Sequence, residues 1–415
     1  MLMSTRTPLA SRRVLAVFGI VALWAPPAWA QEKALTLDQA LEVARQRAPI
    51  AIAARARIEE ARGRYQGAAV RFRDNPVIET EAGPRTREGS TSADVDVAFS
   101  QDFELGGRRK ARIAGAQAGI DRETAFSSDV LRRLLRDVAI AFYRALAAQE
   151  RVRLLTMTEQ VAAEFLRTAE RRYEAGEIPI LEVNLARTSA ARVRAELRAA
   201  TADYTSALGD LRVLLGMRPD EPIAIRDDLR ARRSYDIEQL FAQAKDRPDT
   251  RVLEAEIREA EADIRLGEGL RRPDIGLTSR YQREEGANVF QGGVKITLPV
   301  FSHGQELRAV GTARAGRVRG ELGALLRAIY IEVKVAFDAY LENVAAVEEL
   351  EKNALPSLDE NEALARRSYE EGEIGLAELL LIRRETLEIR LAYVDRLVDA
   401  AIAGVEVEFR SGVLR

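Results

Sequence analysis

The sequence predicts a mainly α-helical fold with a transmembrane β part, built from one unit that occurs twice along the chain. Three observations lead to this fold class. The same ordered series of segments appears in each half of the 415-residue chain, two very long stretches contain almost no proline, and pairs of short segments alternate apolar with polar residues. Each unit is expected to combine long antiparallel coiled-coil helices with two β-strands, which gives four strands in all.

The first thirty residues have the layout of a secretory signal peptide. Arg6, Arg12 and Arg13 precede an apolar run over residues 14–23, and a small-residue cleavage site ends at Ala30. The run is too short to cross a membrane as a helix, and no later stretch approaches the ~20 apolar residues that a membrane helix needs. We therefore expect residues 1–30 to be removed on export, and any contact with membrane lipid to be made by strands.

The composition argues against several classes of protein. Removing the three leader arginines from the 63 basic residues leaves 60 against 65 acidic residues, so no nucleic-acid partner is expected. The chain has no cysteine and one histidine, His303. This argues against a disulfide framework, a soft or imidazole metal site and the paired Glu-x-x-His motifs of a diiron bundle. We interpret His303 as a residue of a surface turn, and the sequence predicts no enzyme, no cofactor and no resident metal.

The two halves correspond at an offset of 196 to 200 residues. The first repeat is expected over residues 31–219 and the second over residues 220–415. The pattern Leu-Asp-Gln-Ala-Leu is answered 200 residues later by Ile-Glu-Gln-Leu-Phe, and each opens a helical stretch. Asn-Pro-Val-Ile is answered by Arg-Pro-Asp-Ile, and each proline ends a helix before β-compatible residues follow.

Strands are predicted where apolar residues alternate with polar ones. The apolar face of these segments consists of Ala93, Val95, Val97, Phe99, Phe103, Ile275, Leu277, Tyr281, Phe290, Val294, Ile296, Leu298 and Val300. Each segment is about ten residues long, which suits a tilted membrane strand. Two ordinary hairpins packed on a soluble core would show the same alternation, so the strands alone leave both alternatives open.

Two helices of unusual length are predicted next. Residues 113–175 contain no proline, and residues 305–371 contain only Pro356. At 1.5 Å per residue, each would be roughly 95 to 100 Å long. An apolar seam with a spacing of three or four, which includes Leu131 and Leu135, predicts coiled-coil packing.

Shorter helices are expected to return along each long one. Two half-length helices placed end to end would pack antiparallel against it. The expected ranges are 37–72 and 178–216 in the first repeat and 237–271 and 376–410 in the second, with residues 217–236 as the connection between the halves.

A Tyr-x-x-Gly-Glu-Ile phrase marks the far end of each helical hairpin, opposite the strands. It consists of Tyr173, Gly176, Glu177 and Ile178 in the first hairpin and of Tyr369, Gly372, Glu373 and Ile374 in the second. We expect both glycines to end their helices in the left-handed conformation, which glycine adopts at no steric cost. Duplication of one hairpin explains why the phrase occurs twice.

In this order, the features resemble those of the TolC-like outer-membrane efflux proteins. The phrases at residues 100–109 (Ser-Gln-Asp-Phe-Glu-Leu-Gly-Gly-Arg-Arg) and 298–305 (Leu-Pro-Val-Phe-Ser-His-Gly-Gln) stand where a strand gives way to a long helix. The first phrase is similar to that of the CzcC-like heavy-metal cation efflux branch. The resemblance implies a homotrimer in outer-membrane lipid, with a twelve-stranded β-barrel continuous with an α-helical tunnel in the periplasm.

The resemblance also implies a function. The chain would be the exit duct of a tripartite efflux system, served by an RND-type inner-membrane pump and a periplasmic adaptor protein that docks on the two Tyr-x-x-Gly-Glu-Ile turns. The implied substrate is a divalent heavy-metal cation. A duct for drugs or other small molecules is the alternative, and a secreted coiled-coil scaffold, which needs neither a trimer nor membrane strands, also stays open.

Two glutamates, Glu182 and Glu378, lie just past the hairpin turns. The resemblance implies that three copies of each would form a ring of carboxylates that narrows the tunnel and favours cations. Leu381 occupies the place where a second acid is often found, so a double ring is not expected. A solvated helix start, where glutamate favours the N-terminal dipole, accounts for the same two residues.

Overall fold

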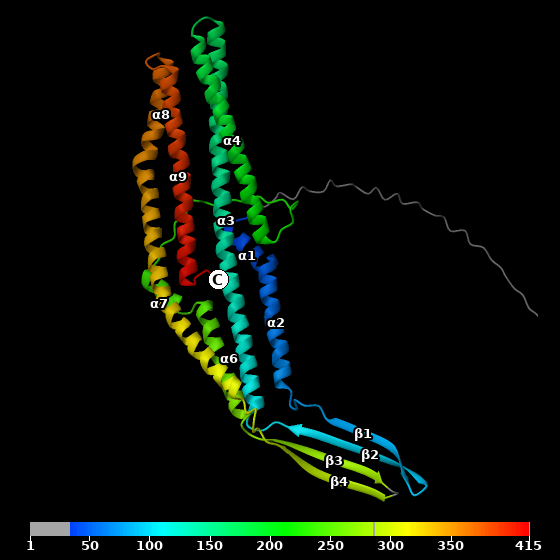
Figure 1. The fold of residues 1–415 in the computed structure, drawn as a ribbon. Coiled ribbons are helices and arrows are strands. Elements are labelled where there is room, and N and C mark those ends of the chain that lie inside the picture. Colours follow the sequence, from blue (N-terminus) through cyan, green and yellow to red (C-terminus); the bar gives the residue numbers. More distant parts are fainter. Residues whose placement is uncertain (1–33, 285–286, 415) are drawn as a thin grey trace, which may run out of the picture. The chain divides into compact units, whose positions relative to one another are not determined.

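The computed structural model describes residues 34–284 and 287–414, so the expected signal peptide lies outside the described residues. In chain order, the elements are α1 (Leu37–Arg47), α2 (Pro49–Ala69), β1 (Val77–Arg87), β2 (Ser90–Phe103), α3 (Arg108–Glu174), α4 (Ile180–Leu215), α5 (Ile237–Ala244), α6 (Pro248–Gly269), β3 (Asp274–Glu284), β4 (Ala287–Thr297), α7 (Gln305–Glu349), the π-helical turn η1 (Leu350–Ala354), α8 (Leu355–Glu370) and α9 (Leu376–Ser411). Apart from η1 and the division of the second long helix, the second half repeats the order of the first (Figure 1).

The long helix α3 lies between two glycines, as the sequence predicts. Gly107 is its N-cap with φ of 74°, and Gly176 follows its C-terminal end with φ of 77°. Only glycine adopts these left-handed angles without steric cost. With 67 residues, α3 spans about 100 Å at 1.5 Å per residue. Figure 1 shows it running from the strands to the opposite end of the helical part, where the chain turns into α4.

The second long helical segment runs without a gap over residues 305–370, close to the prediction of one helix over residues 305–371, but five residues within it are π-helical and not α-helical. The α-helical pattern stops at Glu349, and the five residues of η1 precede α8. Pro356 lies at the start of α8. Its ring has no N–H and clashes with the carbonyl four residues earlier, so a wider π-helical turn in front of it accommodates the proline without ending the helical path.

Proline also divides the two half-length helices that precede the strands. We predicted one helix over residues 37–72, but α1 ends at Arg47 and α2 begins at Pro49. The range 237–271 is divided in the same way, by Pro248. Each proline occupies the first turn of its helix, where its missing N–H costs nothing. The returning helices α4 and α9 lie within two residues of their predicted bounds.

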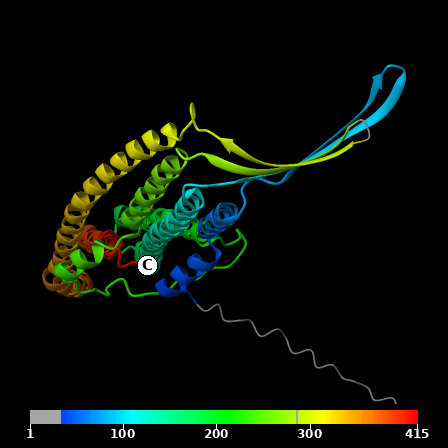
Figure 2. The same cartoon turned by 90° about the horizontal axis from the view of Figure 1, so that it is seen from below.

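The strands form one antiparallel sheet in the order β1-β2-β3-β4. Its middle pair joins the two repeats, with Phe99 of β2 opposite Ser279 of β3. β4 ends at Thr297, so Leu298 and Val300, which we predicted on the strand, lie beyond it. Figure 2 shows the four strands leaving the helical part together as one ribbon.

The register separates the side chains of the sheet into an apolar and a polar face, as the alternation predicted. Directly opposite residues share a face in an antiparallel sheet. Val97 lies opposite Tyr281, which lies opposite Phe290, and the rings of Tyr281 and Phe290 are 4.8 Å apart. On the other face, Asp96 lies opposite Gln282 and accepts a hydrogen bond from its Nε2 at 2.7 Å.

Helix α6 packs against α7 of its own repeat, as predicted, and also against α3, which the sequence did not predict. It lies between α3 and α7 in Figure 2, and it contacts both along its length. Glycines allow this close approach. A Cβ on Gly106 would lie 2.7 Å from the carbonyl oxygen of Gly269, and a Cβ on Gly304 would collide with the backbone of Gly267. The helix ends next to the strands therefore pack backbone against backbone.

The largest apolar cluster surrounds the middle of α3. Leu135, Val138 and Phe142 of α3 are fully buried together with Leu211 and Leu215 of α4. Residues of α1, the end of α9 and the connection over residues 217–236 pack on the same cluster. The predicted apolar seam of the long helix is thus the core of the helical part.

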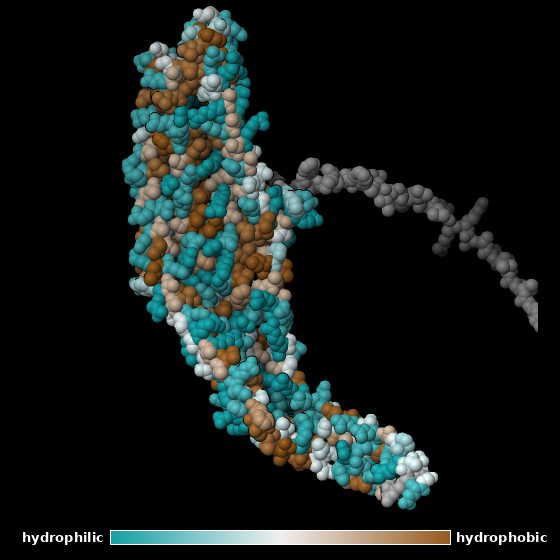
Figure 3. All heavy atoms as spheres, viewed as in Figure 1, coloured by the Kyte–Doolittle hydropathy of each residue, from teal (hydrophilic) through white to brown (hydrophobic). Residues whose placement is uncertain are grey.

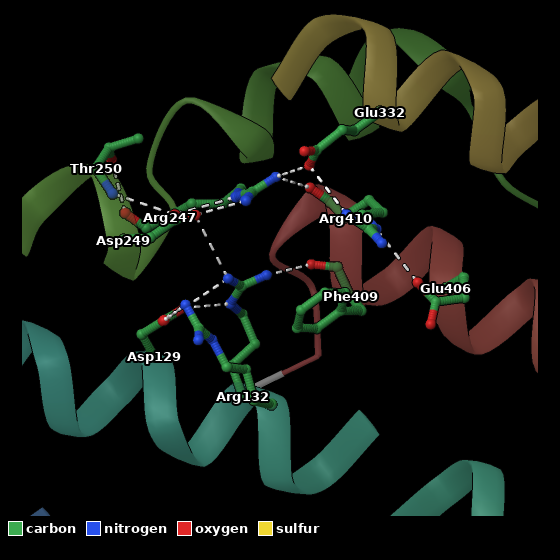
Figure 4. Close-up of polar contacts among 10 residues, drawn as sticks. Asp129, Arg132, Arg247, Asp249, Thr250, Glu332, Glu406, Phe409 and Arg410 are labelled. Atoms are coloured by element: carbon green, nitrogen blue, oxygen red, sulfur yellow. Dashed lines mark hydrogen bonds and ion pairs between the residues drawn. The ribbon is translucent and has the colours of Figure 1, made fainter. Parts of the chain in front are cut away.

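Two buried arginines hold the C-terminal end of α9 (Figure 4). Arg132 of α3 is 2% exposed and donates from Nη1 to the carbonyl oxygen of Phe409 at 2.7 Å and from Nη2 to Asp129 Oδ1 at 2.5 Å. Arg247, the N-cap of α6, is 4% exposed and donates from Nη1 to the carbonyl oxygen of Arg410 at 3.1 Å. The last carbonyls of a helix have no partner within it, so these arginines satisfy groups that would otherwise be buried without hydrogen bonds.

Carboxylates balance the buried charges. Arg247 donates to Asp249 Oδ2 at 2.5 Å and to Glu332 Oε2 of α7 at 3.1 Å. Burial alone would raise the pKa of Asp249, but the hydrogen bonds and charge of Arg247, with the charge of Arg132, lower it overall. Because Asp249 also lies 3.6 Å from Arg132 Nη2, one network connects α3, α6, α7 and α9.

We expect Arg132→Met to lower the free energy of unfolding by about 3 kcal/mol, because it leaves the buried carbonyl of Phe409 unpaired and removes one cation from Asp129. Arg133 is the matched control, since it also contacts Asp129, at 2.6 Å, but its side chain is 63% exposed. Arg133→Met should cost less than about 1 kcal/mol. Chemical denaturation in detergent measures both, and equal losses would show that the buried network does not hold α9.

Candidate functional site

Each hairpin ends in a turn formed by the predicted docking residues. We name residues 173–181 the first tip and residues 369–377 the second tip; both lie at the end of the helices opposite the strands (Figure 1). In the first tip, the N–H of Gly176 donates to the carbonyl of Tyr173 and the N–H of Glu177 to the carbonyl of Arg172, both at 2.9 Å. The second tip repeats this pattern 196 residues later, with Gly372 at φ of 80°.

The glutamate of each tip stabilises the turn by accepting a hydrogen bond from a side chain five residues earlier. Glu177 accepts a hydrogen bond from Arg172 Nε at 3.2 Å, and this bond raises the pKa of Arg172. Glu373 accepts a hydrogen bond from Ser368 Oγ at 2.9 Å. Both glutamates remain exposed, so their second carboxylate oxygens are open to solvent or to a partner.

The two tyrosines of the tips have different surroundings. Tyr173 is 45% exposed, whereas Tyr369 is half-buried and packs edge-on against Phe165 of α3, with ring centroids 6.3 Å apart. Ile178 of the first tip is buried in one apolar cluster with Leu376 of the second. The two hairpins therefore contact each other at their tips, and Ile178 and Tyr369 lie on that internal contact, whereas Ile374 is half-buried.

Glu182 and Glu378 lie in the first turns of α4 and α9, as expected. Glu182 is half-buried and Glu378 is exposed, and among the described residues neither carboxylate has a hydrogen bond or ion pair. Leu181 and Leu381 beside them are 65% and 61% exposed. One chain does not distinguish a carboxylate ring from a solvated helix start, so the predicted constriction stays a prediction.

In the described ranges, no three His, Cys, Asp or Glu side chains come together as possible metal ligands. His303 lies in the turn before α7, with its Nδ1 3.1 Å from Arg308 Nη2. By length and hydropathy, no described helix qualifies as a membrane span.

The sheet is the second candidate surface, because its apolar side chains are not covered. Phe290 is 80%, Ile78 68% and Val294 62% exposed. Hydrophobic as well as hydrophilic side chains reach the surface of the strands in Figure 3. Within residues 34–284 and 287–414, β1 pairs only with β2 and β4 only with β3, so both outer edges of the sheet lack partners. Exposed apolar side chains that share one face of a sheet are typical of a contact with lipid or protein.

Sequence reasoning missed the charged residues inside the helical part. Arg132 and Arg247 organise the end of α9, and Arg383 of α9 lies over the ring of Phe165 of α3. The burial of Arg132 could have been predicted from its position, because it directly follows Leu131 of the apolar seam. For Arg247, the only signal was the following proline, which marks a helix start.

Comparisons with known proteins agree with this geometry. Residues 40–217 match the family described as outer membrane efflux protein. The chain is 26% identical over 337 residues to the cobalt-zinc-cadmium resistance protein CzcC of Cupriavidus metallidurans, covering 80% of each chain. It is also 26% identical over 271 residues to the nickel-cobalt-cadmium resistance protein NccC of Alcaligenes xylosoxydans, covering 62% of each.

A solved structure shares the fold. The CmeC outer membrane channel of Campylobacter jejuni superimposes with a TM-score of 0.75 at 15% identity, over 91% of this chain and 85% of CmeC. The chain thus resembles the TolC-like outer-membrane efflux proteins in sequence and has their channel fold, and it is similar to the heavy-metal branch that contains CzcC.

Proposed function

We propose that this protein is the exit duct of a tripartite efflux system, in which a homotrimer passes divalent heavy-metal cations from an inner-membrane pump and a periplasmic adaptor to the outside. The observation that carries the proposal is the sheet, which has one exposed apolar face, one polar face and two unpaired edges. An unpaired strand edge in lipid leaves backbone groups without hydrogen bonds, so only a closed sheet is stable there. Three copies with four strands each would close it.

The internal repeat predicts the strand register between β4 of one copy and β1 of the next. The glycines before α3 and α7 are 197 residues apart, and so are the prolines before β1 and β3. In the described sheet, Phe99 of β2 lies opposite Ser279 of β3. The equivalent pair between β4 of one copy and β1 of the next is Ile296 and Ala82. Both residues lie on the apolar face, so this register keeps the two faces matched around the ring.

The polar face, which would line the bore, favours cations over anions. Away from the β1–β2 turn, seven carboxylates share this face with three cationic side chains; the ten residues are Glu79, Glu81, Asp94, Asp96, Asp102, Asp274, Glu284, Arg85, Arg280 and Lys295. Among the described residues, Glu79 and Glu81 have no ion pair. A bore lined mainly by one sign of charge raises the local concentration of the opposite ion. This supports a metal cation as substrate, in keeping with the resistance proteins that the chain resembles.

Metal and drug transport are distinguished by resistance. A strain that lacks this gene should become sensitive to zinc, cobalt or cadmium and should accumulate the metal, and the intact gene should restore resistance. Loss of resistance to organic drugs with unchanged metal tolerance would instead support the alternative, a drug duct. Unchanged tolerance to both would contradict a role in efflux.

Neighbouring strand residues on opposite faces test the membrane assignment. We expect Phe99→Arg to impair insertion, because an arginine on a lipid-facing position near the midplane costs about 2 to 4 kcal/mol, and Ile296→Arg, near the end of β4, to impair it less. Thr297→Arg and Ser100→Arg are matched controls on the polar face and should insert normally. The measurement is the amount of folded protein in the outer-membrane fraction. Equal damage at both faces would identify the sheet as a packed hairpin pair.

The tips are the proposed docking surface for the adaptor. Gly176 and Gly372 need the left-handed conformation, and the space around both is open, so Gly176→Val combined with Gly372→Val should strain only the turns. Gly375 is the matched control, since it lies in the same loop and in equally open space but has φ of −81°. We expect metal resistance and adaptor cross-linking to fail in the double variant, with trimer yield unchanged, and to persist in Gly375→Val. Normal cross-linking of the double variant would exclude the tips as the docking site.

A further inference from the structure

A cavity lies between the two helical hairpins, apart from the tips and the sheet. It has a volume of about 170 Å³ and is lined by α3 and α4 of the first hairpin and by α8 and α9 of the second. Its apolar lining consists of Leu154, Met157, Val161, Phe165, Val193, Leu380 and Leu387. An engineered apolar cavity of ~150 Å³ in another protein binds benzene. The space between the hairpins therefore suits a group of about one aromatic ring.

The charged lining of the cavity is mainly cationic. Four arginines and two glutamates contribute to it, namely Arg192, Arg383, Arg384, Arg390, Glu196 and Glu362. Three of the arginines have a carboxylate partner. Arg192 donates to Glu196 at 2.7 Å and Arg390 to Glu362 at 3.0 Å. Arg384 donates to Glu388, also at 2.7 Å.

Arg383 differs from the other three. Within residues 34–284 and 287–414 it forms no hydrogen bond or ion pair, and its Nε is buried without a hydrogen-bond partner. Its guanidinium carbon lies 4.6 Å from the centroid of the Phe165 ring. Burial lowers the pKa of Arg383. The nearby Glu362 accepts a hydrogen bond from Arg390 and not from Arg383. A half-buried guanidinium whose Nε is buried without a hydrogen-bond partner is unfavourable, so an anion in the cavity would satisfy it.

We propose that this cavity binds an aromatic carboxylate, a ligand with one ring and one carboxylate group. The ring would pack among Phe165, Met157 and Leu387, and the carboxylate would accept hydrogen bonds from Arg383. A guanidinium and a carboxylate form strong charge-assisted hydrogen bonds, which an uncharged ring of the same size cannot make. Since both hairpins line the cavity, the ligand would join them. This inference does not depend on which substrate the protein exports.

Calorimetric titration of the full-length protein in lipid nanodiscs, with benzoate as the probe, tests the proposal. We expect one benzoate per chain. Benzamide has the same ring without the charge and should bind at least about tenfold more weakly, as expected for the loss of one charge-assisted hydrogen bond. Arg383→Met should weaken benzoate binding by a similar factor. Arg396→Met, which removes an arginine of the same helix that pairs with Asp399 outside the cavity lining, should leave it unchanged.

A second variant keeps the test decisive if Arg383→Met does not fold. Ala162→Phe fills the cavity from α3 while Arg383 is kept, and it should abolish benzoate binding. The proposal is overturned if benzoate gives no binding up to millimolar concentration, if benzamide binds equally well, or if benzoate binding survives both Arg383→Met and Ala162→Phe.

Discussion

Everything in this structure is arranged around a sheet that one chain cannot complete. The four strands leave β1 and β4 with unpaired outer edges and expose an apolar face that no described helix covers. Unpaired backbone groups and uncovered apolar side chains are both unfavourable in water, and an open edge is unfavourable in lipid as well. In the proposed trimer, copies of the same chain would solve both problems, because β4 of one copy would pair with β1 of the next while lipid would cover the apolar face.

The helical part follows from the same constraint, since each strand pair is continuous with a long helix. Gly107 and Gly304 turn the chain from strand to helix, and Gly267 and Gly269 let α6 pack between α3 and α7. The repeats are nevertheless unequal. The C-terminal end of α9 is held by a buried ion network through Arg132 of α3 and Arg247 of α6. This network therefore connects α6, α7 and α9 of the second repeat to α3 of the first.

Patterns that depend on local chemistry could be predicted from the sequence. Glycine at a helix end, alternation along a strand and an apolar seam are each set by backbone sterics or burial, so Gly176, Gly372, the strand faces and the core of α3 were all found. Features that depend on packing between distant segments could not be predicted. The contact of α6 with α3, the internal position of Tyr369 and the unpaired Arg383 require knowledge of which helices become neighbours. The π-helical turn before Pro356 was missed because a proline in a helical pattern indicates strain but not how the chain relieves it.

Cross-linking between the outer strands tests the central claim most directly. The chain has no cysteine, so Ala82→Cys together with Ile296→Cys introduces the only thiols, one at each edge of the sheet. Directly opposite residues on antiparallel strands have Cβ atoms about 5 Å apart, close enough for a disulfide after a small adjustment. After oxidation of outer membranes, the double variant should give linked dimers and trimers and nothing larger, while each single variant should stay uncross-linked. Species larger than a trimer, or a double variant that remains monomeric, would contradict a closed ring of three chains.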